Sequence, residues 1–189
     1  MSDIPSSVIA SLKAVIGERS TPLHEPCFTG TESELVLDCI DSTFVSSVGK
    51  YVDRFEQELA DFCGVERAVA VTNGTAALSL AYRLAGVRRD DEVIMPAMTF
   101  VATANAACHL GAVPHFVDAH PETLGLDLGK LRAWLGDIAE LAQGHCRNRK
   151  TGRRIGAIVP MHTFGHMCDM RALLEIAAEF RIPVIEDAA

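Results

Sequence analysis

The sequence predicts an α/β protein of three layers, in which helices cover both faces of a mainly parallel sheet. Two observations carry this prediction. From about residue 68 onward, short runs rich in β-branched residues alternate with amphipathic segments of helix length, which indicates βαβ units. Gly64, Gly86 and Gly111 follow three of the periodic apolar segments, at positions where glycine commonly ends a helix.

Residues 1–30 are expected to form an N-terminal helix and arm, and residues 31–189 the main domain. Apolar residues recur at helical spacing over residues 6–17, which predicts a short amphipathic helix. The connector Thr21–Gly30 is interrupted by Pro and Gly and is typical of an arm rather than a core.

Two more helices are predicted before the alternating region. Thr31–Glu34 matches a capping box, so a helix is expected to begin there. A polar loop of small residues, Thr43–Gly49, follows that helix. The apolar stripe from Tyr51 to Phe62 predicts the next helix, with Gly64 as its stop signal.

In the alternating region each predicted strand leads into a predicted helix. The expected strands span Ala68–Val71, Glu92–Met95, Val113–Val117, Ile155–Met161 and Ile182–Asp187. The expected helices span about Thr75–Ala85, Phe100–Leu110, Asp127–Leu141 and Asp169–Arg181. Ligands of open α/β sheets bind beyond the carboxyl ends of the strands, so the residues that follow the strands are candidate site residues.

Composition and charge argue against several classes of partner. The formal net charge of -8 at pH 7 disfavours binding to nucleic acid or to an anionic membrane. No run approaches the roughly 18 apolar residues of a membrane helix, and no signal peptide is visible after Met1. The cysteines form no C-x-x-C pair, which indicates reduced thiols in a cytoplasmic protein.

Basic residues gather around a Lys150-Thr151-Gly152 turn in the insert 145–154. No aromatic residues are interleaved with them, so a nucleic-acid patch is not favoured. A solvated surface turn is the favoured interpretation, and a phosphate contact is the alternative.

The segment Asn73-Gly74-Thr75-Ala76 has the features of an anion site at a strand-to-helix junction. Gly74 permits a tight turn, and the small Thr75 and Ala76 let a ligand approach the first N–H groups of the helix. Free amides and the helix dipole together favour a phosphate there. The segment is neither a Walker loop nor G-x-G-x-x-G, which disfavours nucleoside triphosphates and dinucleotides. An ordinary turn capped by Thr75 is the alternative.

Aromatic and imidazole side chains follow two other strands. Phe100 could stack on a planar ligand, although the residue type alone favours a core position. His162 and His166, with Cys168 beyond them, have a spacing compatible with a metal ion. Because Gly165 interrupts this segment and no fourth ligand is evident, we expect no metal site.

Asp187 closes the last predicted strand. Either a ligand or the capping of a following helix could explain a carboxylate there, because carboxylates are seldom buried without a partner. A phosphate cradle, a flat aromatic ring and a carboxylate at one sheet edge would suit a planar, phosphorylated ligand that is cationic at one ring atom. Pyridoxal 5'-phosphate fits, since a buried aspartate can hold its pyridinium nitrogen protonated.

Four motifs in order resemble those of the DegT/StrS-type sugar aminotransferases, which are fold-type-I pyridoxal-phosphate enzymes. The motifs are Phe44–Val52, Asn73–Leu78, Pro96–Asn105 and Pro183–Ala189. The resemblance implies that residues 31–189 are the N-terminal part of the large, cofactor-binding domain, incomplete at its C-terminus. The insert 147–154 and the loop before Lys50 most resemble the branch that acts on UDP-linked 4-keto-6-deoxy-N-acetylhexosamines in bacillosamine and legionaminic acid synthesis.

By position, the resemblance implies a role in cofactor binding for several residues. Gly74, Thr75 and Ala76 would bind the cofactor phosphate, Phe100 would stack on the pyridine ring, and Asp187 would bind its nitrogen.

Three further candidates follow from the same resemblance, besides Asn73 in the phosphate segment. His162 would have a structural role beside the cofactor. Ser46 and Ser47 would lie near the sugar nucleotide.

The implied reaction moves an amino group, with glutamate as the expected donor, to the C4 ketone of a nucleotide-linked 4-keto-6-deoxy sugar in a homodimer. The family's Schiff-base lysine lies beyond Ala189, and none of Lys13, Lys50, Lys130 and Lys150 matches its position. The chain by itself is therefore expected to be inactive.

Three alternatives remain open at this point. The first is a dehydratase relative that has histidine in place of the lysine. The second is a non-catalytic short form that binds sugar nucleotide or partner subunits. The third is a flavodoxin-like module that binds a phosphate through Asn73–Ala77.

Overall fold

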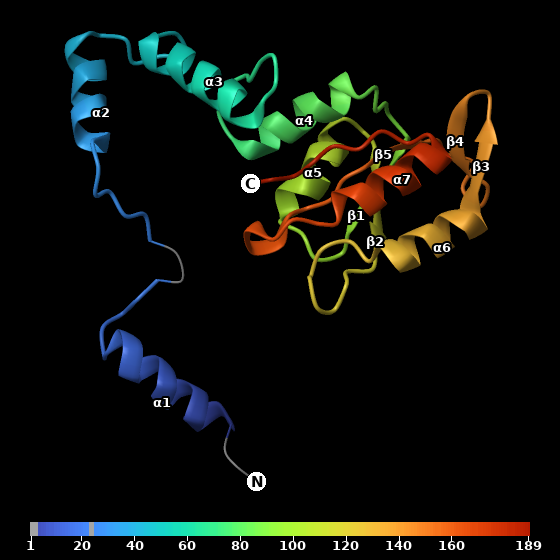
Figure 1. The fold of residues 1–189 in the computed structure, drawn as a ribbon, viewed down its shortest axis with the longest axis horizontal. Helices are drawn as coiled ribbons and strands as arrows, with labels where there is room; N and C mark the ends of the chain where they lie inside the picture. Colours follow the sequence, from blue (N-terminus) through green and yellow to red (C-terminus); the bar gives the residue numbers. More distant parts are fainter. Residues whose placement is uncertain (1–3, 23–24) are drawn as a thin grey trace. The chain divides into compact units, whose positions relative to one another are not determined.

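The computed structural model describes residues 4–22 and 25–189 and confirms the predicted α/β class (Figure 1). The chain divides into two compact units between Ala68 and Val69. This division differs from the boundary expected near residue 30, and the assignment of residues 31–189 to one large domain stays a prediction. No helix in the described part of the chain is both long and apolar enough to span a membrane.

The first unit consists of the three predicted helices, α1 (Ile4–Ile16), α2 (Glu32–Asp41) and α3 (Lys50–Cys63). The predicted capping box is wrong, since Thr31 makes no side-chain cap bond and the Glu32 carboxylate accepts instead from the N–H of Gly30, at 2.8 Å. Gly64 ends α3 in the left-handed conformation, with φ of 64°.

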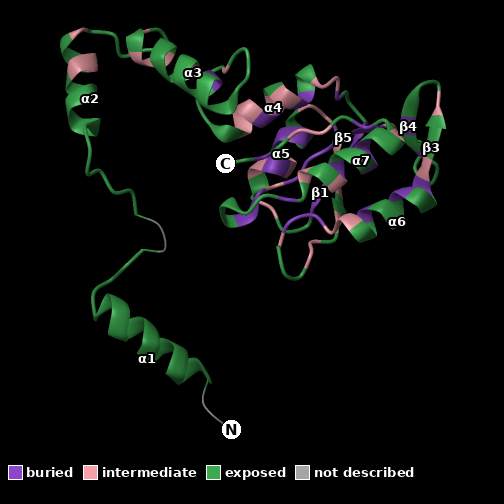
Figure 2. Ribbon diagram, viewed as in Figure 1, coloured by how far each residue is buried: buried purple, intermediate pink, exposed green. Residues whose placement is uncertain are grey.

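The apolar stripes of the first unit are largely exposed, as the green ribbon in Figure 2 shows. Helices α1 and α2 bury none of their residues, and α3 buries Ala60 alone. Within the described residues these stripes have no core of their own to pack against.

The second unit is organised around a parallel sheet of order β2-β1-β5, made of Val113–Val117, Glu92–Pro96 and Ile155–Ile158. Two parallel bridges, Ile158 with Val184 and Met161 with Asp187, add the last segment of the chain beside β5. The strand predicted over 182–187 therefore appears as isolated bridges, and the one predicted over 155–161 is shorter. Their direction is as predicted, so their carboxyl ends share one edge.

Helices cover both faces of this sheet. They are α4 (Gly74–Leu84), α5 (Val101–His109), α6 (Leu128–Ile138) and α7 (Met170–Phe180). On β1, Ile94 packs with the buried residues of α6 and α7, whereas Val93 and Met95 pack with those of α4 and α5. Alternate side chains of β1 thus pack into two separate apolar clusters, one on each face of the sheet, as a three-layer arrangement requires.

Two sequence-based assignments are wrong. Residues 68–71 are not a strand: none of the pairings recorded within the described ranges includes them, and a strand needs a hydrogen-bonding neighbour. The helix expected to reach Leu141 ends at Ile138, where β3 (Ala139–Ala142) begins and pairs antiparallel with β4 (His145–Asn148). Gln143 and Gly144 both have positive φ, 53° and 81°, as a two-residue hairpin turn demands.

The basic insert 145–154, which contains β4, is only partly the solvated turn that we predicted. Its tip is exposed, but Arg154 pairs with Asp91 and donates to the carbonyl of Gly86. The insert therefore fastens the loop that enters the amino end of β1, away from the carboxyl edge where the candidate residues lie.

Glu92, at the amino end of β1, is the centre of a buried polar network. Its carboxylate accepts from Thr151 at 2.6 Å and from Asn148 and His115 at 2.9 Å. Trp134 donates its indole N–H to Nε2 of His115 at 2.9 Å, so the imidazole proton lies on Nδ1 and points at Glu92. Burial by itself would raise the pKa of Glu92, but these hydrogen bonds outweigh it and the pKa is lowered.

We predict that Glu92 stabilises the fold at neutral pH and that this contribution is lost in acid. Because its pKa is lower in the folded state, the stabilisation is complete above the ordinary glutamate range, about pH 4.3, and disappears as the pH falls through the folded-state pKa. When the free energy of unfolding is measured with denaturant between about pH 3 and pH 7, it should fall less steeply toward acid pH for Glu92→Gln than for wild type. Glu122→Gln, at an exposed position, is the control and should follow the wild-type profile. An unchanged acid limb in Glu92→Gln would contradict this role.

Candidate functional site

Asp187 lies at the carboxyl edge of the parallel sheet and is buried, with 6% of its surface exposed. Its N–H donates to the carbonyl of Pro160 at 2.9 Å, and its carbonyl accepts from the N–H of His162 at 3.1 Å. These backbone bonds continue the sheet and fix where the side chain begins.

The two carboxylate oxygens of Asp187 differ in their partners. Oδ2 accepts a 2.6 Å hydrogen bond from the hydroxyl of Thr103 in the first turn of α5. Within the described residues, the contact recorded for Oδ1 is a long one of 3.5 Å from the N–H of Ala189. The carboxylate is therefore buried and oriented, with acceptor capacity left on one oxygen.

Thr103 is a site residue that the sequence analysis missed. It is fully buried, its hydroxyl lies 2.7 Å from that of Thr99, and its carbonyl accepts from the hydroxyl of Tyr82 at 2.9 Å. Burial, and after it the charge of Asp187, raises the pKa of Tyr82, so Tyr82 stays a neutral donor. The available signal was the presence of two threonines four residues apart, Thr99 just before α5 and Thr103 in its first turn.

The anion segment is capped by Asn73 and not by Thr75. Oδ1 of Asn73 accepts from the N–H of Ala76 at 2.9 Å, so that amide already has a partner. The N–H groups of Gly74 and Thr75 precede the first intrahelical bond, which runs from Ala77 to the Asn73 carbonyl. If a phosphate binds here, these two amides are the donors, and Ala76 would contribute its small size.

Packing against the described residues does not explain Gly74. A Cβ added to it would meet no atom within 4 Å, and its φ lies outside the left-handed region. The space beside the first turn of α4 is therefore open, as the approach of a ligand to the backbone requires.

Phe100 is exposed to 72% and immediately precedes the first residue of α5. The core position favoured by its residue type is thus wrong. An exposed aromatic ring that follows the carboxyl end of β1 has a face available to a planar ligand, and stacking stays a prediction.

His162 is buried, and both of its ring nitrogens have partners. Nδ1 accepts from the N–H of Cys168 at 3.3 Å, so the proton lies on Nε2, 3.0 Å from Glu186 Oε2. This arrangement suits a structural role in holding the chain beside Asp187. In residues 4–22 and 25–189, no group of three or more His, Cys, Asp and Glu side chains could hold a metal ion.

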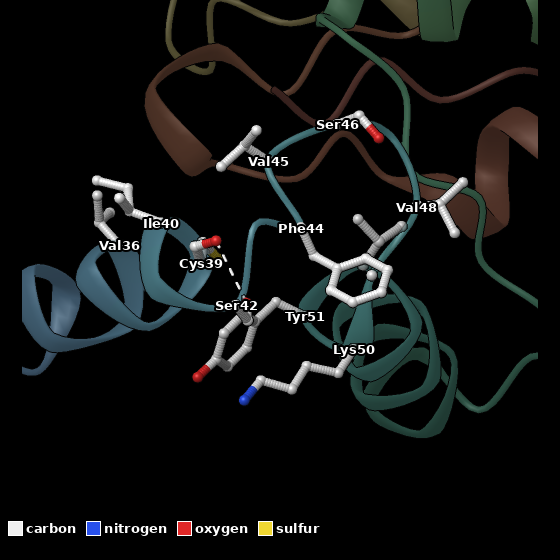
Figure 3. Close-up of a pocket in the computed structure, with 12 residues that line it drawn as sticks. Val36, Cys39, Ile40, Ser42, Phe44, Val45, Ser46, Val48, Lys50 and Tyr51 are labelled. Carbon is white, nitrogen blue, oxygen red and sulfur yellow. Dashed lines mark hydrogen bonds between the residues drawn. The ribbon is translucent and has the colours of Figure 1, made fainter.

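Ser46 and Ser47 belong to the first unit and are exposed. Ser46 lines a cavity of about 270 Å³ with mainly apolar walls between α2 and α3 (Figure 3). At this cavity, Lys50 and the hydroxyl of Tyr51 both contact Asp38, at 2.5 and 2.8 Å. Ser47 is not among the residues that line it.

The structure brings some of the predicted residues together. Thr103, in the segment that follows β1, and His162, in the segment that follows β5, both donate a hydrogen bond to Asp187. Tyr82 of α4 donates to the carbonyl of Thr103 and so links α4 to these two segments. Ser46 belongs to the other compact unit.

A model of the DegT/DnrJ/EryC1/StrS aminotransferase family matches residues 26–189. The chain belongs to that family. The resemblance inferred from the four motifs is thereby confirmed, and the flavodoxin-like alternative is wrong. The closeness to the UDP-sugar branch stays an expectation.

Several known proteins are similar to the chain over most of its length. GDP-perosamine synthase of Caulobacter vibrioides is 39% identical over 100% of this chain and 43% of that protein. A putative pyridoxal phosphate-dependent aminotransferase of Bacillus subtilis, EpsN, is 32% identical over 88% of this chain and 40% of that protein. The crystal structure of 3-amino-5-hydroxybenzoic acid synthase matches with a TM-score of 0.73 and 34% identity, over 90% of this chain and 40% of that one. The chain therefore spans less than half the length of each.

Pyridoxal phosphate is the cofactor of this family, which confirms the cofactor predicted from the sequence. The residues present suit it. Within the described residues, Gly74 and Thr75 offer amides without a recorded partner beside open space, and Asp187 offers a buried carboxylate with spare acceptor capacity. The fold-type-I architecture is also confirmed by the solved relative.

We predict that Gly74→Ala weakens cofactor binding without destabilising the apoprotein. The new Cβ meets no atom of the described residues within 4 Å, so the free energy of unfolding should stay within about 1 kcal/mol of wild type. The apparent Kd for pyridoxal phosphate, measured by titration of the full-length apoprotein, should rise about tenfold, since the added methyl enters the space left for the ligand.

Gly156→Ala is the matched control for this prediction. Its Cβ would lie 3.1 Å from Asp91 Oδ2 and 3.4 Å from Val87, so it should destabilise the fold by about 1–3 kcal/mol with no direct effect on the phosphate. Wild-type cofactor affinity in Gly74→Ala would contradict the assignment of the phosphate site.

Proposed function

We propose that the full-length protein is a pyridoxal-phosphate-dependent aminotransferase. It takes an amino group from an amino-acid donor, glutamate in our expectation, and delivers it to the C4 ketone of a nucleotide-linked 4-keto-6-deoxy sugar. The observation that carries the proposal is the buried, oriented carboxylate of Asp187 at the carboxyl edge of the sheet. Family membership supports amino transfer as the reaction class.

Each candidate residue has a distinct task in this proposal. The amides of Gly74 and Thr75 bind the phosphate of the cofactor, Phe100 covers one face of its ring, and Asp187 keeps a proton on its ring nitrogen. When bound, the cofactor supplies an electron sink for the carbon that carries the amino group. A carboxylate is needed because a ring cation without a partner in a buried site would lose its proton.

The position of Asp187 also serves to keep water from this ion pair. Asp187 is buried, and the hydroxyl of Thr103 holds Oδ2 from the protein side, so the carboxylate is oriented with little access to solvent. A charge held in this way interacts more strongly with the ring nitrogen than a solvated carboxylate would.

The identity of the nucleotide is a finer part of the proposal. The resemblance of the insert 147–154 and of the loop before Lys50 favours a UDP-linked sugar. The similar protein of Caulobacter vibrioides, in contrast, is named GDP-perosamine synthase. The cavity between α2 and α3, with Ser46 in its wall, is the candidate place for part of the sugar nucleotide. Both nucleotides therefore belong in the assay.

The remaining machinery is expected outside residues 1–189. The lysine that binds the cofactor is proposed to follow Ala189 in the full-length protein, and the 189-residue chain by itself is proposed not to turn over. We also propose that the enzyme works in the cytoplasm as a homodimer. The exposed apolar stripes of α2 and α3 are compatible with a subunit contact.

The predicted activity can be tested with the full-length protein, pyridoxal phosphate, glutamate, and GDP- or UDP-linked 4-keto-6-deoxy sugars. A 4-amino sugar should form together with 2-oxoglutarate, both followed by mass spectrometry. Asp187→Asn should lower the rate by about 100-fold or more, because a neutral amide cannot hold the ring proton, and should leave the circular dichroism spectrum unchanged.

Asp137→Asn, at an exposed position on α6, is the control and should keep the wild-type rate. A product that has lost oxygen without gaining nitrogen would indicate the dehydratase alternative. A wild-type rate in Asp187→Asn would show that the strand-end carboxylate is not the partner of the cofactor.

A further inference from the structure

We propose that Thr103 is a positioning residue that fixes which oxygen of Asp187 is presented to the cofactor, and that Thr99 holds Thr103 in that orientation. This inference rests on the proposed function, since it concerns how Asp187 meets the ring nitrogen. It concerns two hydroxyl groups, those of Thr99 and Thr103, that are connected to Asp187 by consecutive hydrogen bonds.

The direction of these hydrogen bonds follows from the acceptor at their end. An ionised carboxylate can only accept, so the proton of the Thr103 hydroxyl must point to Asp187 Oδ2, at 2.6 Å. The Thr103 oxygen then has only lone pairs left for Thr99, whose hydroxyl must be the donor across the 2.7 Å between them. The two hydrogen bonds therefore point the same way: Thr99 donates to Thr103, and Thr103 donates to Asp187.

Thr103 is held more firmly than a threonine in a helix usually is. It is fully buried in the first turn of α5, its N–H donates to the carbonyl of Phe100 at 3.1 Å, and its own carbonyl accepts from Tyr82. A helical threonine commonly turns its hydroxyl to a backbone carbonyl one turn back. Here the hydroxyl bonds to two side chains instead, one of which comes from the last segment of the sheet.

This arrangement makes the two oxygens of Asp187 unequal. Oδ2 is committed to Thr103, and Oδ1 keeps its acceptor capacity apart from the 3.5 Å contact with Ala189 among the described residues. Oδ1 is thus the oxygen that meets the ring nitrogen. Without the Thr103 hydroxyl, Oδ2 would be a buried anionic oxygen short of a donor, which disfavours the charged form of Asp187. Because it is the charged form that keeps a proton on the ring nitrogen, the ring nitrogen would be protonated less completely.

The test compares two ligands on the full-length apoprotein: pyridoxal phosphate and its 1-deaza analogue, in which carbon replaces the ring nitrogen. Thr103→Val keeps the shape of the side chain and removes the hydroxyl, whereas Thr103→Ser restores a hydroxyl. We expect Thr103→Val to raise the Kd for pyridoxal phosphate about tenfold and to leave the Kd for the deaza analogue within about twofold of wild type. Thr103→Ser should bind both ligands within about threefold of wild type.

Thr151→Val is the matched control. It removes the hydroxyl that binds the buried Glu92 at the opposite edge of the sheet, so it changes stability without changing the preference between the two ligands. Thr99→Val should weaken pyridoxal phosphate selectively as well, by a smaller factor than Thr103→Val, because it acts through Thr103.

Three outcomes would overturn the inference. Equal weakening of both ligands in Thr103→Val would mean a general structural role. Wild-type affinity for both ligands in that variant would mean that the hydroxyl does not matter. A wild-type protein that binds the deaza analogue as well as pyridoxal phosphate would overturn the role of Asp187 in the proposed function, and the inference about Thr103 with it.

Discussion

The position of Asp187 beside β5 is the constraint on which the rest of the site depends. Two backbone hydrogen bonds, to Pro160 and from His162, carry the parallel sheet far enough to bring this carboxylate to the carboxyl edge. At that edge, one hydrogen bond from the hydroxyl of Thr103 to Oδ2 fixes the orientation of the carboxylate. The motifs that follow β1 and β5 are distant in sequence, and they become one site because parallel strands end on the same side.

The two buried acids of the sheet show how the same chemistry can serve structure or function. Glu92, at the amino end of β1, accepts from Thr151, Asn148 and His115, and so its charge is satisfied within the protein. Asp187 has one oxygen satisfied and the other nearly free within the described chain. A buried charge with capacity to spare calls for a partner, and the ring nitrogen of the family's cofactor is one. In the basic insert, Arg154 fastens the amino end of β1 through Asp91 and Gly86, and a phosphate contact at the exposed tip stays an untested alternative.

The sequence predicted the fold where local signals and tertiary packing agree. Val113–Val117 and the helix ends at Gly64 and Gly86 were foreseen because β-branched runs and glycines act locally. The hairpin around Gln143 was missed because its first strand continues the apolar period of α6. Residues 68–71 have the composition of a strand, but pairing depends on a neighbour that no local pattern reveals. Phe100 was judged by residue type, and its exposure is set by what packs around it. Thr103 was missed because its role is a contact with a residue far along the chain, which periodicity does not encode.

The central claim is that Asp187 holds a proton on the ring nitrogen of pyridoxal phosphate. The most direct measurement is the ¹⁵N chemical shift of the ring nitrogen in ¹⁵N-labelled pyridoxal phosphate bound to the full-length protein at neutral pH. The account predicts the shift of a protonated pyridinium in the wild type and of a neutral pyridine in Asp187→Asn. A neutral pyridine nitrogen in the wild-type protein would contradict it.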